Sequence, residues 1–339
     1  MTFPIHLFSH WFPVCLSRQL GRRPRSCTIL GQPLVLFRDS AGCVAALLDR
    51  CSHRNAPLSR GRVRQNTIAC PYHGWEFDRT GECQAIPGKT GAFAHPLRCV
   101  PVFPAIEEAP LIWVRPTAGS AAPEPPPRHH VVDQPGYTSL VRTFTLQAPL
   151  LDTLENFLDA THTHFVHAGL VRTAGQRKSV QVTVRRGTDH VEAEYVDEGQ
   201  QSGLIPRLFG GSISHSFGRF LLPATVQLEY RAGERIVLRI TLYFAPRDER
   251  CHEVFALLTI RMPRWLIWLL SLPLGWFLWR VVRQDQRILA LQEANAQRFG
   301  GEHYTSTELD LLRPHIARLL QTGPMPVGAG AEKQVTMLL

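Results

Sequence analysis

Two short stretches of the chain carry metal-ligating side chains in the same order, a cysteine followed by a histidine. They are Cys51-Ser52-His53 and Cys70-Pro71-Tyr72-His73, with sixteen residues between them. Two thiolates and two imidazoles can hold a zinc ion or a Rieske-type [2Fe–2S] cluster, in which two cysteines bind one iron and two histidines bind the other. A zinc site of this composition usually pairs cysteine with cysteine and histidine with histidine. Because each stretch offers one sulfur and one nitrogen, the order favours the iron–sulfur cluster over zinc.

A second group of candidate ligands lies between residues 155 and 167, where three histidines follow an aspartate. Mononuclear iron oxygenases bind Fe(II) through two histidines and one carboxylate and leave other positions open. On a helix, His162 and His164 point about 200° apart and cannot share one ion. His162 and His167 point about 140° apart, so they can share an ion if the helix breaks between them. Asp159 lies on the same helix face as His162.

The residues around both groups resemble those of Rieske non-haem iron oxygenases. The flanks of the first group, Cys51 to Leu58 and Cys70 to Phe77, are similar to the two cluster loops of that family. The second group has the family's D-x-x-H-x-x-x-x-H pattern, preceded by Asn156. The resemblance covers nearly the whole chain. The chain is shorter than the large subunits of ring-dihydroxylating dioxygenases. It looks more like stand-alone oxygenase components such as vanillate and dicamba O-demethylases and aminopyrrolnitrin oxygenase.

The resemblance implies two metal centres and their ligands. The cluster would be a [2Fe–2S] group held by Cys51, His53, Cys70 and His73. The second centre would be a mononuclear Fe(II) held by two histidines and by a carboxylate at the start of a downstream helix. For that third position we expect Asp285, with Glu293 and Asp310 as rivals; the histidine ligands would be His162 and His167.

The resemblance also implies roles for residues that bind no metal. Asn156 and Asp159 are expected to be catalytic. In the family the aspartate hydrogen-bonds across a subunit boundary to a cluster histidine and carries electrons between the centres. His164 is expected to pack beside the iron site rather than to bind the metal.

The implied function is that of the terminal oxygenase component of a Rieske monooxygenase system. Electrons from NAD(P)H would arrive through a ferredoxin, a reductase or both, and O₂ would hydroxylate, O- or N-demethylate, or N-oxygenate an apolar cyclic or aromatic substrate. Such components are commonly homotrimers. One alternative is the α subunit of a cis-dihydroxylating ring dioxygenase. An alternative of another class is a non-catalytic Rieske electron carrier fused to a binding domain.

The expected fold is α+β. Residues 1–115 are expected to form an antiparallel β Rieske domain, and the proline-rich residues 116–135 a linker. Residues 136–325 would form a helix-grip (START-like) catalytic domain with a curved antiparallel sheet, and residues 326–339 a flexible tail. Patterning predicts strand–turn–strand over residues 33–48 and a strand over 111–114. Helices are expected over residues 151–168, 284–297 and 307–320.

Charge and cysteine content indicate the partners and the cellular compartment of the protein. The formal net charge is +9, and six arginines flank the cluster stretches: Arg50, Arg54, Arg60, Arg62, Arg64 and Arg79. A basic face beside a redox centre suits an acidic electron donor better than nucleic acid. The eight cysteines show no disulfide spacing, and the first residues lack the basic start and apolar run of a secretory signal. We therefore expect a cytoplasmic protein, with membrane association as an open alternative.

One apolar segment stands apart from these expectations. Trp265 to Trp279 contains no charged residue and holds four of the seven tryptophans, and Arg264 and Arg280 bracket it. As a helix it would reach about 22 Å, against about 30 Å of bilayer hydrocarbon, so a transmembrane span is disfavoured. Two alternatives remain: a buried or pocket-lining helical hairpin, or a membrane-surface anchor or gate for an oily substrate.

Overall fold

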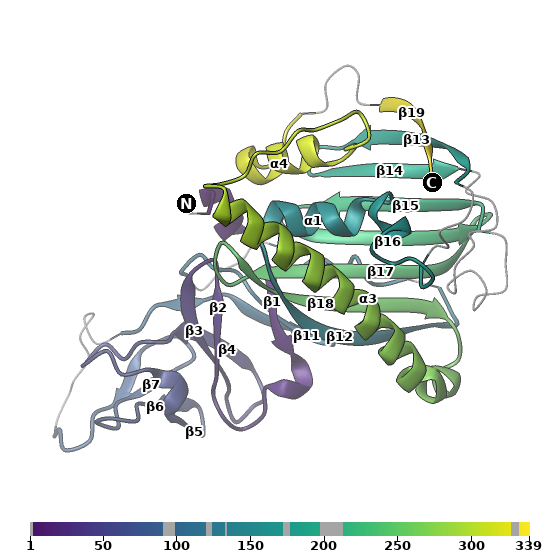
Figure 1. Cartoon of the computed structure of the whole chain (residues 1–339). Coiled ribbons are helices and arrows are strands. Elements are labelled where there is room, and N and C mark those ends of the chain that lie inside the picture. Colours follow the sequence, from purple (N-terminus) through teal and green to yellow (C-terminus); the bar gives the residue numbers. More distant parts are fainter. Residues whose placement is uncertain are drawn as a thin grey trace. The chain divides into compact units, whose positions relative to one another are not determined.

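The computed structural model describes residues 3–90, 99–119, 124–132, 134–171, 177–196, 213–326 and 332–339 (Figure 1). The chain forms two compact units. The N-terminal unit contains residues 1–127 and 245–248, and the C-terminal unit contains residues 128–244 and 249–339. The division at residue 128 falls within the segment 116–135 that the sequence marks as a linker.

In its described residues, the N-terminal unit contains three small antiparallel sheets. The first has the order β1 (Phe12–Leu16), β11 (Leu111–Val114), β10 (Ala105–Glu108). The second has the order β2 (Arg25–Ile29), β3 (Gln32–Arg38), β4 (Val44–Leu48), β9 (Val102–Phe103). The third has the order β5 (Arg62–Arg64), β6 (Thr67–Ala69), β7 (Glu76–Asp78), β8 (Cys83–Ala85). The predicted strand–turn–strand over residues 33–48 is confirmed as β3 and β4.

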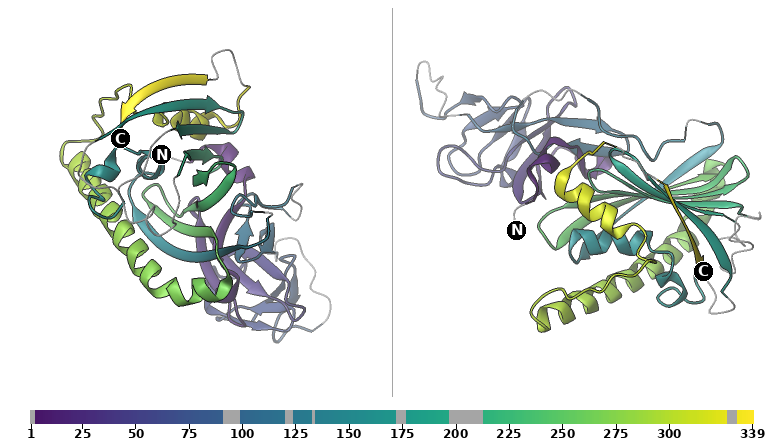
Figure 2. Two further views of the ribbon diagram at one scale, coloured as in Figure 1. Left: turned by 90° about the vertical axis from the view of Figure 1, so that its right-hand side faces the viewer. Right: turned by 90° about the horizontal axis from the view of Figure 1, so that it is seen from above.

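Over the part that the structure describes, the C-terminal unit contains one eight-stranded antiparallel sheet. Its strand order is β12 (Tyr137–Gln147), β18 (Cys251–Arg261), β17 (Arg235–Pro246), β16 (Thr225–Ala232), β15 (His215–Leu221), β14 (His190–Val196), β13 (Ser179–Arg186), β19 (Glu332–Leu338). The sheet curves, and α1 (Leu150–Leu158), α3 (Arg264–Arg298) and α4 (Arg313–Thr322) lie on its open side (Figures 1 and 2). The antiparallel architecture confirms the expected fold class.

The helix predicted over residues 151–168 is wrong beyond Leu158. Asp159 is extended (φ −76°, ψ 113°) and ends α1. Its carboxylate accepts hydrogen bonds from the backbone N–H groups of Thr161 (2.7 Å) and His162 (3.1 Å). These bonds begin a separate 3₁₀ turn over His162–His164. Short polar side chains that bond to nearby backbone in this way compete with helix continuation.

The helical hairpin predicted for Trp265–Trp279 is also wrong. The segment belongs to one continuous helix, α3, which runs through Pro273. A proline inside a helix removes one N–H···O bond, and the affected carbonyl here belongs to Leu269, which is exposed. The third predicted helix is shorter than expected: it begins at Arg313, with Pro314 in its first turn, rather than at Thr307. Proline is favoured there because its missing N–H would have no helical partner.

The flexible tail predicted for residues 326–339 is wrong for its last part. Residues 332–338 form β19, which pairs with β13 along its length, from Ser179 opposite Leu338 to Arg185 opposite Glu332. Met337 is buried by this pairing. An edge strand needs only backbone partners and one buried face. Because β19 is rich in polar and charged residues, its hydrophobic pattern is too weak to predict a strand.

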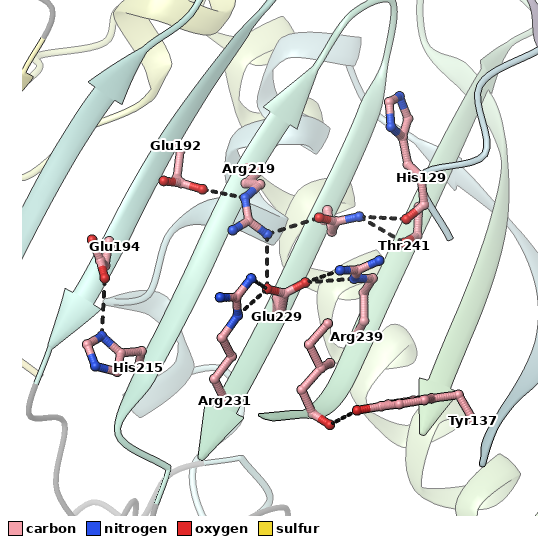
Figure 3. A network of polar contacts seen from close by, with 12 residues as sticks. His129, Tyr137, Glu192, Glu194, His215, Arg219, Glu229, Arg231, Arg239 and Thr241 are labelled. Atoms are coloured by element: carbon pink, nitrogen blue, oxygen red, sulfur yellow. Dashed lines mark hydrogen bonds and ion pairs between the residues drawn. The ribbon is translucent and has the colours of Figure 1, made fainter. Parts of the chain in front are cut away.

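The two faces of the large sheet differ in chemistry. Leu228 and Tyr230 of β16 point toward the helices and line a cavity, and Gln227 and Glu229 alternate with them on the opposite face. Glu229 is fully buried and pairs with Arg231 and Arg239 at 2.6 Å (Figure 3). Gln227 donates to the carbonyl of His129 and Arg239 to that of Val131, which places this part of the predicted linker segment against the same face.

Three arginines hold Glu229 ionised. Burial alone would raise its pKa, but the charges of Arg219 and Arg239 and the hydrogen bonds from Arg239 and Arg231 lower the pKa below its ordinary value. Because the folded-state pKa is lowered, the resulting stability is present above the unfolded-state pKa, about 4.3 for glutamate. It is lost as the pH falls through the folded-state value.

Glu229→Gln is expected to reduce the free energy of unfolding at pH 7 by about 3 kcal/mol, because it leaves the partly buried guanidinium groups of Arg231 and Arg239 without this counter-charge. As the pH falls below about 4.5, the variant should also lose less stability than the wild type does. Urea unfolding followed by circular dichroism at several pH values measures both effects. The matched control is Glu234→Gln in the exposed turn after β16, and equal curves for the two variants would contradict the prediction.

Candidate metal centres

The two Cys/His loops of the N-terminal unit close in the same way. The N–H of Cys51 donates to the carbonyl of Ala56, and the N–H of Asn55 donates back to the carbonyl of Cys51. In the second loop the N–H of Cys70 donates to the carbonyl of Trp75, and the N–H of Gly74 donates to the carbonyl of Cys70. The fifth residue of each loop has a positive φ, 61° at Asn55 and 72° at Gly74, a conformation that asparagine and glycine tolerate best. Each loop is thus shaped by its own backbone.

The four candidate ligands of these loops converge. Cys51 and Cys70 are buried in one apolar cluster with Phe77. The ring centroids of His53 and His73 lie 4.6 Å apart. Trp75 stacks on the ring of His53 at 4.6 Å and nearly parallel, which covers that imidazole with an apolar surface.

The chemistry of this group fits a cationic iron–sulfur cluster. Burial and the neighbouring Cys70 thiol raise the pKa of the Cys51 thiol to about 11, so a thiolate there needs positive charge beside it. Burial, His73 and Arg54 lower the pKa of His53 and so favour a neutral imidazole. The Nδ1 atom of His53 is buried and has no hydrogen-bond partner among the residues that the structure describes. An orphaned ring nitrogen next to two thiols is the arrangement that a metal ligand requires.

The C-terminal unit brings three further ligands together. His162, His167 and Asp285 each offer one atom, and these atoms lie within 4.8 Å of one another. The Nε2 atom of His167 lies 3.0 Å from Asp285 Oδ1, and that of His162 lies 3.6 Å from the same oxygen. Two imidazoles and one carboxylate form the facial set typical of non-haem Fe(II).

Hydrogen bonds at the far side of each ring fix how the imidazoles are presented. His162 Nδ1 lies 2.6 Å from the carbonyl oxygen of Asp159, and His167 Nδ1 lies 3.0 Å from Gln284 Oε1. Both partners are acceptors, so both Nδ1 atoms donate a proton to them and both Nε2 atoms face Asp285. Each Nε2 atom can donate a proton to Asp285 or, once that proton is lost, offer a lone pair to a metal ion. The role of Gln284 was missed at the sequence level, although its position next to Asp285 was a usable signal.

Asp285 is almost fully buried, at 1 % exposure. Burial alone would raise its pKa, but hydrogen bonds from His162, His167 and Asn156 lower it, so the carboxylate is ionised. Asn156 donates through Nδ2 to Asp285 Oδ1 at 3.0 Å. The residue expected to be catalytic therefore contacts the carboxylate of the metal group.

The other predicted residues lie outside this group. His164 follows His162 in the 3₁₀ turn and contributes no atom to it. Glu293 instead pairs with Arg250 at 2.6 Å. Asp310 accepts from the backbone of Thr307 at 2.6 Å.

Asp159 lies next to the group but presents its backbone carbonyl, rather than its carboxylate, to the ring of His162. The carboxylate caps the turn at Thr161 and His162, and Oδ2 stays 3.7 Å from His162 Nδ1. The side chain is about one-third exposed, so one of its edges remains open to solvent in the single chain.

A buried ionic network anchors α1, which carries Asn156. Arg313 of α4 pairs with Asp152 at 2.8 Å and also with Glu155. Tyr304 donates its hydroxyl to Asp152 at 2.8 Å. These contacts tie the helix that precedes the His162 turn to the last helix of the chain.

An apolar cavity of about 260 Å³ reaches the three-ligand group. Its walls come from the open face of the sheet, from α1 and from α3, and include Phe144, Phe157, Leu228, Leu242, Phe277 and Trp279. His162, His167 and Asp285 lie in its lining. The cavity can hold a small apolar molecule against the metal group.

Family comparisons agree with this geometry. Residues 10–104 match the Rieske [2Fe-2S] domain, and residues 146–321, more than half of the chain, match the vanillate O-demethylase oxygenase C-terminal domain. The chain belongs to the Rieske oxygenase family. It is an oxidoreductase that uses O₂, and it carries a [2Fe–2S] cluster and a mononuclear iron.

Individual Rieske oxygenases resemble the chain over most of its length. The oxygenase component of dicamba O-demethylase from Stenotrophomonas maltophilia is 31% identical over 65% of this chain, and the match spans 61% of that protein. Methylxanthine N3-demethylase NdmB from Pseudomonas putida is 29% identical over 75% of this chain and 73% of its own length. The crystal structure of dicamba monooxygenase bound to dicamba has the same fold, with a TM-score of 0.80 at 24% identity over 93% of this chain and 96% of that one.

Gln284→Leu is expected to weaken binding of the mononuclear iron by about 10- to 100-fold, because His167 loses the acceptor that fixes its ring. Competition with a chromophoric chelator, on protein whose cluster absorbance is intact, measures the affinity. Gln297→Leu, an exposed position on the same helix, is the matched control. Equal iron affinity in the two variants would show that Gln284 does not position His167.

Proposed function

We propose that the chain is the terminal oxygenase component of a Rieske monooxygenase system that acts on an apolar cyclic or aromatic compound. The observation that carries this proposal is the apolar cavity whose lining contains His162, His167 and Asp285. Hydroxylation, O- or N-demethylation and N-oxygenation are all within the reach of such a site. The relatives named as O- and N-demethylases favour demethylation.

We assign the metal ligands residue by residue. Cys51, His53, Cys70 and His73 would hold the cluster, and His162, His167 and Asp285 would hold the mononuclear iron. When bound, the cluster supplies single electrons and the iron activates O₂.

The chain positions the ligands, holds the charged carboxylate and excludes water at this site. Asp159 and Gln284 keep the Nδ1 protons of the two histidines away from the centre. Asn156 holds the carboxylate of Asp285 in place. The apolar side chains of the cavity exclude water from the reacting atoms and orient the substrate through its shape.

Electrons reach the protein from a reductase or ferredoxin. All six arginines around the cluster loops are exposed, which supports an acidic donor docking there. Arg64 alone among them forms an ion pair in the described structure, with Glu76. We further propose that the protein works as a homotrimer in the cytoplasm, with peripheral membrane contact through Trp265–Trp279.

Two alternatives make different predictions. A cis-dihydroxylating dioxygenase would place two oxygen atoms in one product; one relative is an oxygenase subunit of 3-chlorobenzoate-3,4-dioxygenase, 33% identical over 47% of this chain. A non-catalytic electron carrier would have no use for a second metal group, and the convergence of His162, His167 and Asp285 argues against it.

A product analysis tests the proposed function. The protein, loaded with both metals and a generic reductase, is given methoxylated and N-methylated aromatic compounds under ¹⁸O₂, and products are identified by mass spectrometry. One labelled oxygen or loss of a methyl group supports the monooxygenase. Two labelled oxygens in a cis-diol would assign the dioxygenase. If the protein, with both metals bound, oxidised no compound in a broad panel, that result would count against a catalytic function.

His162→Ala and His167→Ala are each expected to remove the mononuclear iron and all turnover, because each takes one of three ligands from the centre. The cluster absorbance and its EPR signal should remain, since the cluster loops lie in the other unit. Iron analysis against cluster content measures this. His164→Ala is the matched control and should retain three irons per chain; loss of iron in that variant alone would overturn the ligand assignment.

Asp159→Asn is expected to keep both metals but to slow cluster reoxidation in a single turnover by at least about tenfold. The carboxylate accepts two backbone N–H groups at the start of the His162 turn, whereas an amide accepts at one end and donates at the other. Stopped-flow absorbance after pre-reduction, with substrate and O₂ added together, follows the reoxidation. A wild-type rate would remove Asp159 from the proposed set of catalytic residues.

A further inference from the structure

Six large apolar side chains form a continuous stripe on the outside of α3. They recur at helical spacings of three and four residues and are 54–83% exposed: Trp265, Trp268, Leu269, Leu272, Trp276 and Trp279. Contiguous apolar surface of this size on a soluble domain marks an interaction site. We call this set the outer stripe.

The opposite side of the same helix half is also apolar, but it is packed. Ile267 is buried against Leu238 and Ile260 of the sheet, and Phe277 is 6% exposed. Arg142 of β12 donates to the carbonyl of Ser271 at 3.3 Å. The N-terminal half of α3 is thus apolar all round while being covered on one side only, and Figure 2 shows the helix at the outer surface of its unit. Helices with apolar residues all round lie in a core or in contact with lipid.

Length and docking decide how such a helix could meet a bilayer. Among the described residues, α3 is the one helix whose length and apolar composition would allow it to cross a membrane. Its inner side is fixed to the sheet, however, and the outer stripe spans only about 21 Å against about 30 Å of hydrocarbon. The stripe can therefore lie in the plane of the membrane interface, and its tryptophans are the side chains that this layer prefers.

Charge distinguishes an anionic lipid surface from a symmetric pairing of this helix with the same helix of a second chain. From residue 254 to residue 284 there is no aspartate or glutamate, and the charged residues are Arg261, Arg264, Arg280 and Arg283. Arg280 lies over the ring of Trp276 and Arg283 over that of Trp279. Two such helices paired antiparallel about a two-fold axis would bring their arginines together. Lipid phosphates would neutralise the same arginines.

The outer stripe is continuous with the catalytic cavity. Gly275, Phe277, Leu278, Trp279 and Val282 of α3 line the cavity, and so does Asp285 of the metal group. Trp279 belongs to both surfaces, because it lines the cavity and is 54% exposed. It is six residues from Asp285, about 9 Å along the helix.

We propose that the outer stripe of α3 docks on an anionic bilayer surface and that the substrate is a lipophilic compound dissolved in that bilayer, entering the cavity past Trp279. This inference rests on the proposed oxygenase function for its substrate, but the docking itself does not. The two parts of the inference are tested by binding and by labelling rather than by turnover.

Docking is tested with metal-loaded protein and lipid vesicles. We expect wild-type protein to co-sediment with vesicles containing phosphatidylglycerol and to bind phosphatidylcholine vesicles at least tenfold less. The double variant Trp268→Ser/Leu272→Ser should bind phosphatidylglycerol vesicles at least tenfold less than wild type. Leu291→Ser, an exposed apolar position of α3 outside the stripe, is the matched control and should bind as wild type. Brominated lipids should quench wild-type tryptophan fluorescence but that of the double variant much less.

Entry into the cavity is tested with a photoreactive probe, a diazirine-bearing hexadecane dissolved in the vesicles. After irradiation, mass spectrometry should find label on the outer stripe and also on the cavity side chains Leu228 and Leu242. Val182, which is buried elsewhere in the sheet, should stay unlabelled. Label on the stripe without label in the cavity would overturn the proposed route.

Other outcomes separate the competing explanations. Absence of vesicle binding, or equal binding by the double variant with intact cluster absorbance, overturns the docking. A change of oligomeric state in the double variant, with no vesicle binding by wild type, would assign the stripe to a second copy. His162→Ala should bind vesicles as wild type does. A protein that binds vesicles and takes up the probe but oxidises nothing would retain the docking and the route into the cavity, and would lose the proposed function together with the substrate assignment.

Discussion

The catalytic unit depends on a carboxylate kept ionised in an apolar interior. Asp285 is buried at the end of an apolar cavity, where an isolated charge would be very costly. Hydrogen bonds from Asn156 and the two histidines compensate that cost. The requirement extends outward, because α1 must hold Asn156, the turn after α1 must present His162, and the ionic network of Arg313 must hold α1. All of these contacts therefore help to keep the buried Asp285 carboxylate ionised.

The same logic explains the shape of the segment between α1 and His167. Two imidazoles five residues apart cannot face one point from a regular helix. The helix therefore ends at Asp159, whose carboxylate captures the next N–H groups and whose carbonyl receives the ring proton of His162. One residue both terminates the helix and orients a ligand, which is a structural reason for an aspartate at that position independent of any role in electron transfer.

The sequence was informative where chemistry depends on residue type and spacing. The order of Cys51, His53, Cys70 and His73 distinguished an iron–sulfur cluster from zinc, and the family comparison agrees with that choice. Spacing could not reveal what depends on three-dimensional contact. Gln284 meets His167 across 117 residues, and β19 is a polar edge strand that pairs with β13, a strand far earlier in the chain. The hairpin expected within Trp265–Trp279 failed because α3 continues through Pro273, where the carbonyl that loses its helical partner belongs to the exposed residue Leu269.

The matched closure of the two cluster loops bears on how the protein acquires and keeps its cofactor. Each loop is held by its own pair of backbone hydrogen bonds and by one left-handed residue, Asn55 or Gly74, and none of these contacts involves a ligating atom. The candidate ligands therefore lie in loops whose backbone bonds do not depend on a metal, between strands that share one apolar core. Such loops would favour insertion of the cluster into an already folded domain over folding of the domain around the metal. A cluster destroyed by oxygen, a constant hazard for a protein that handles O₂, can then be replaced without the polypeptide being made again.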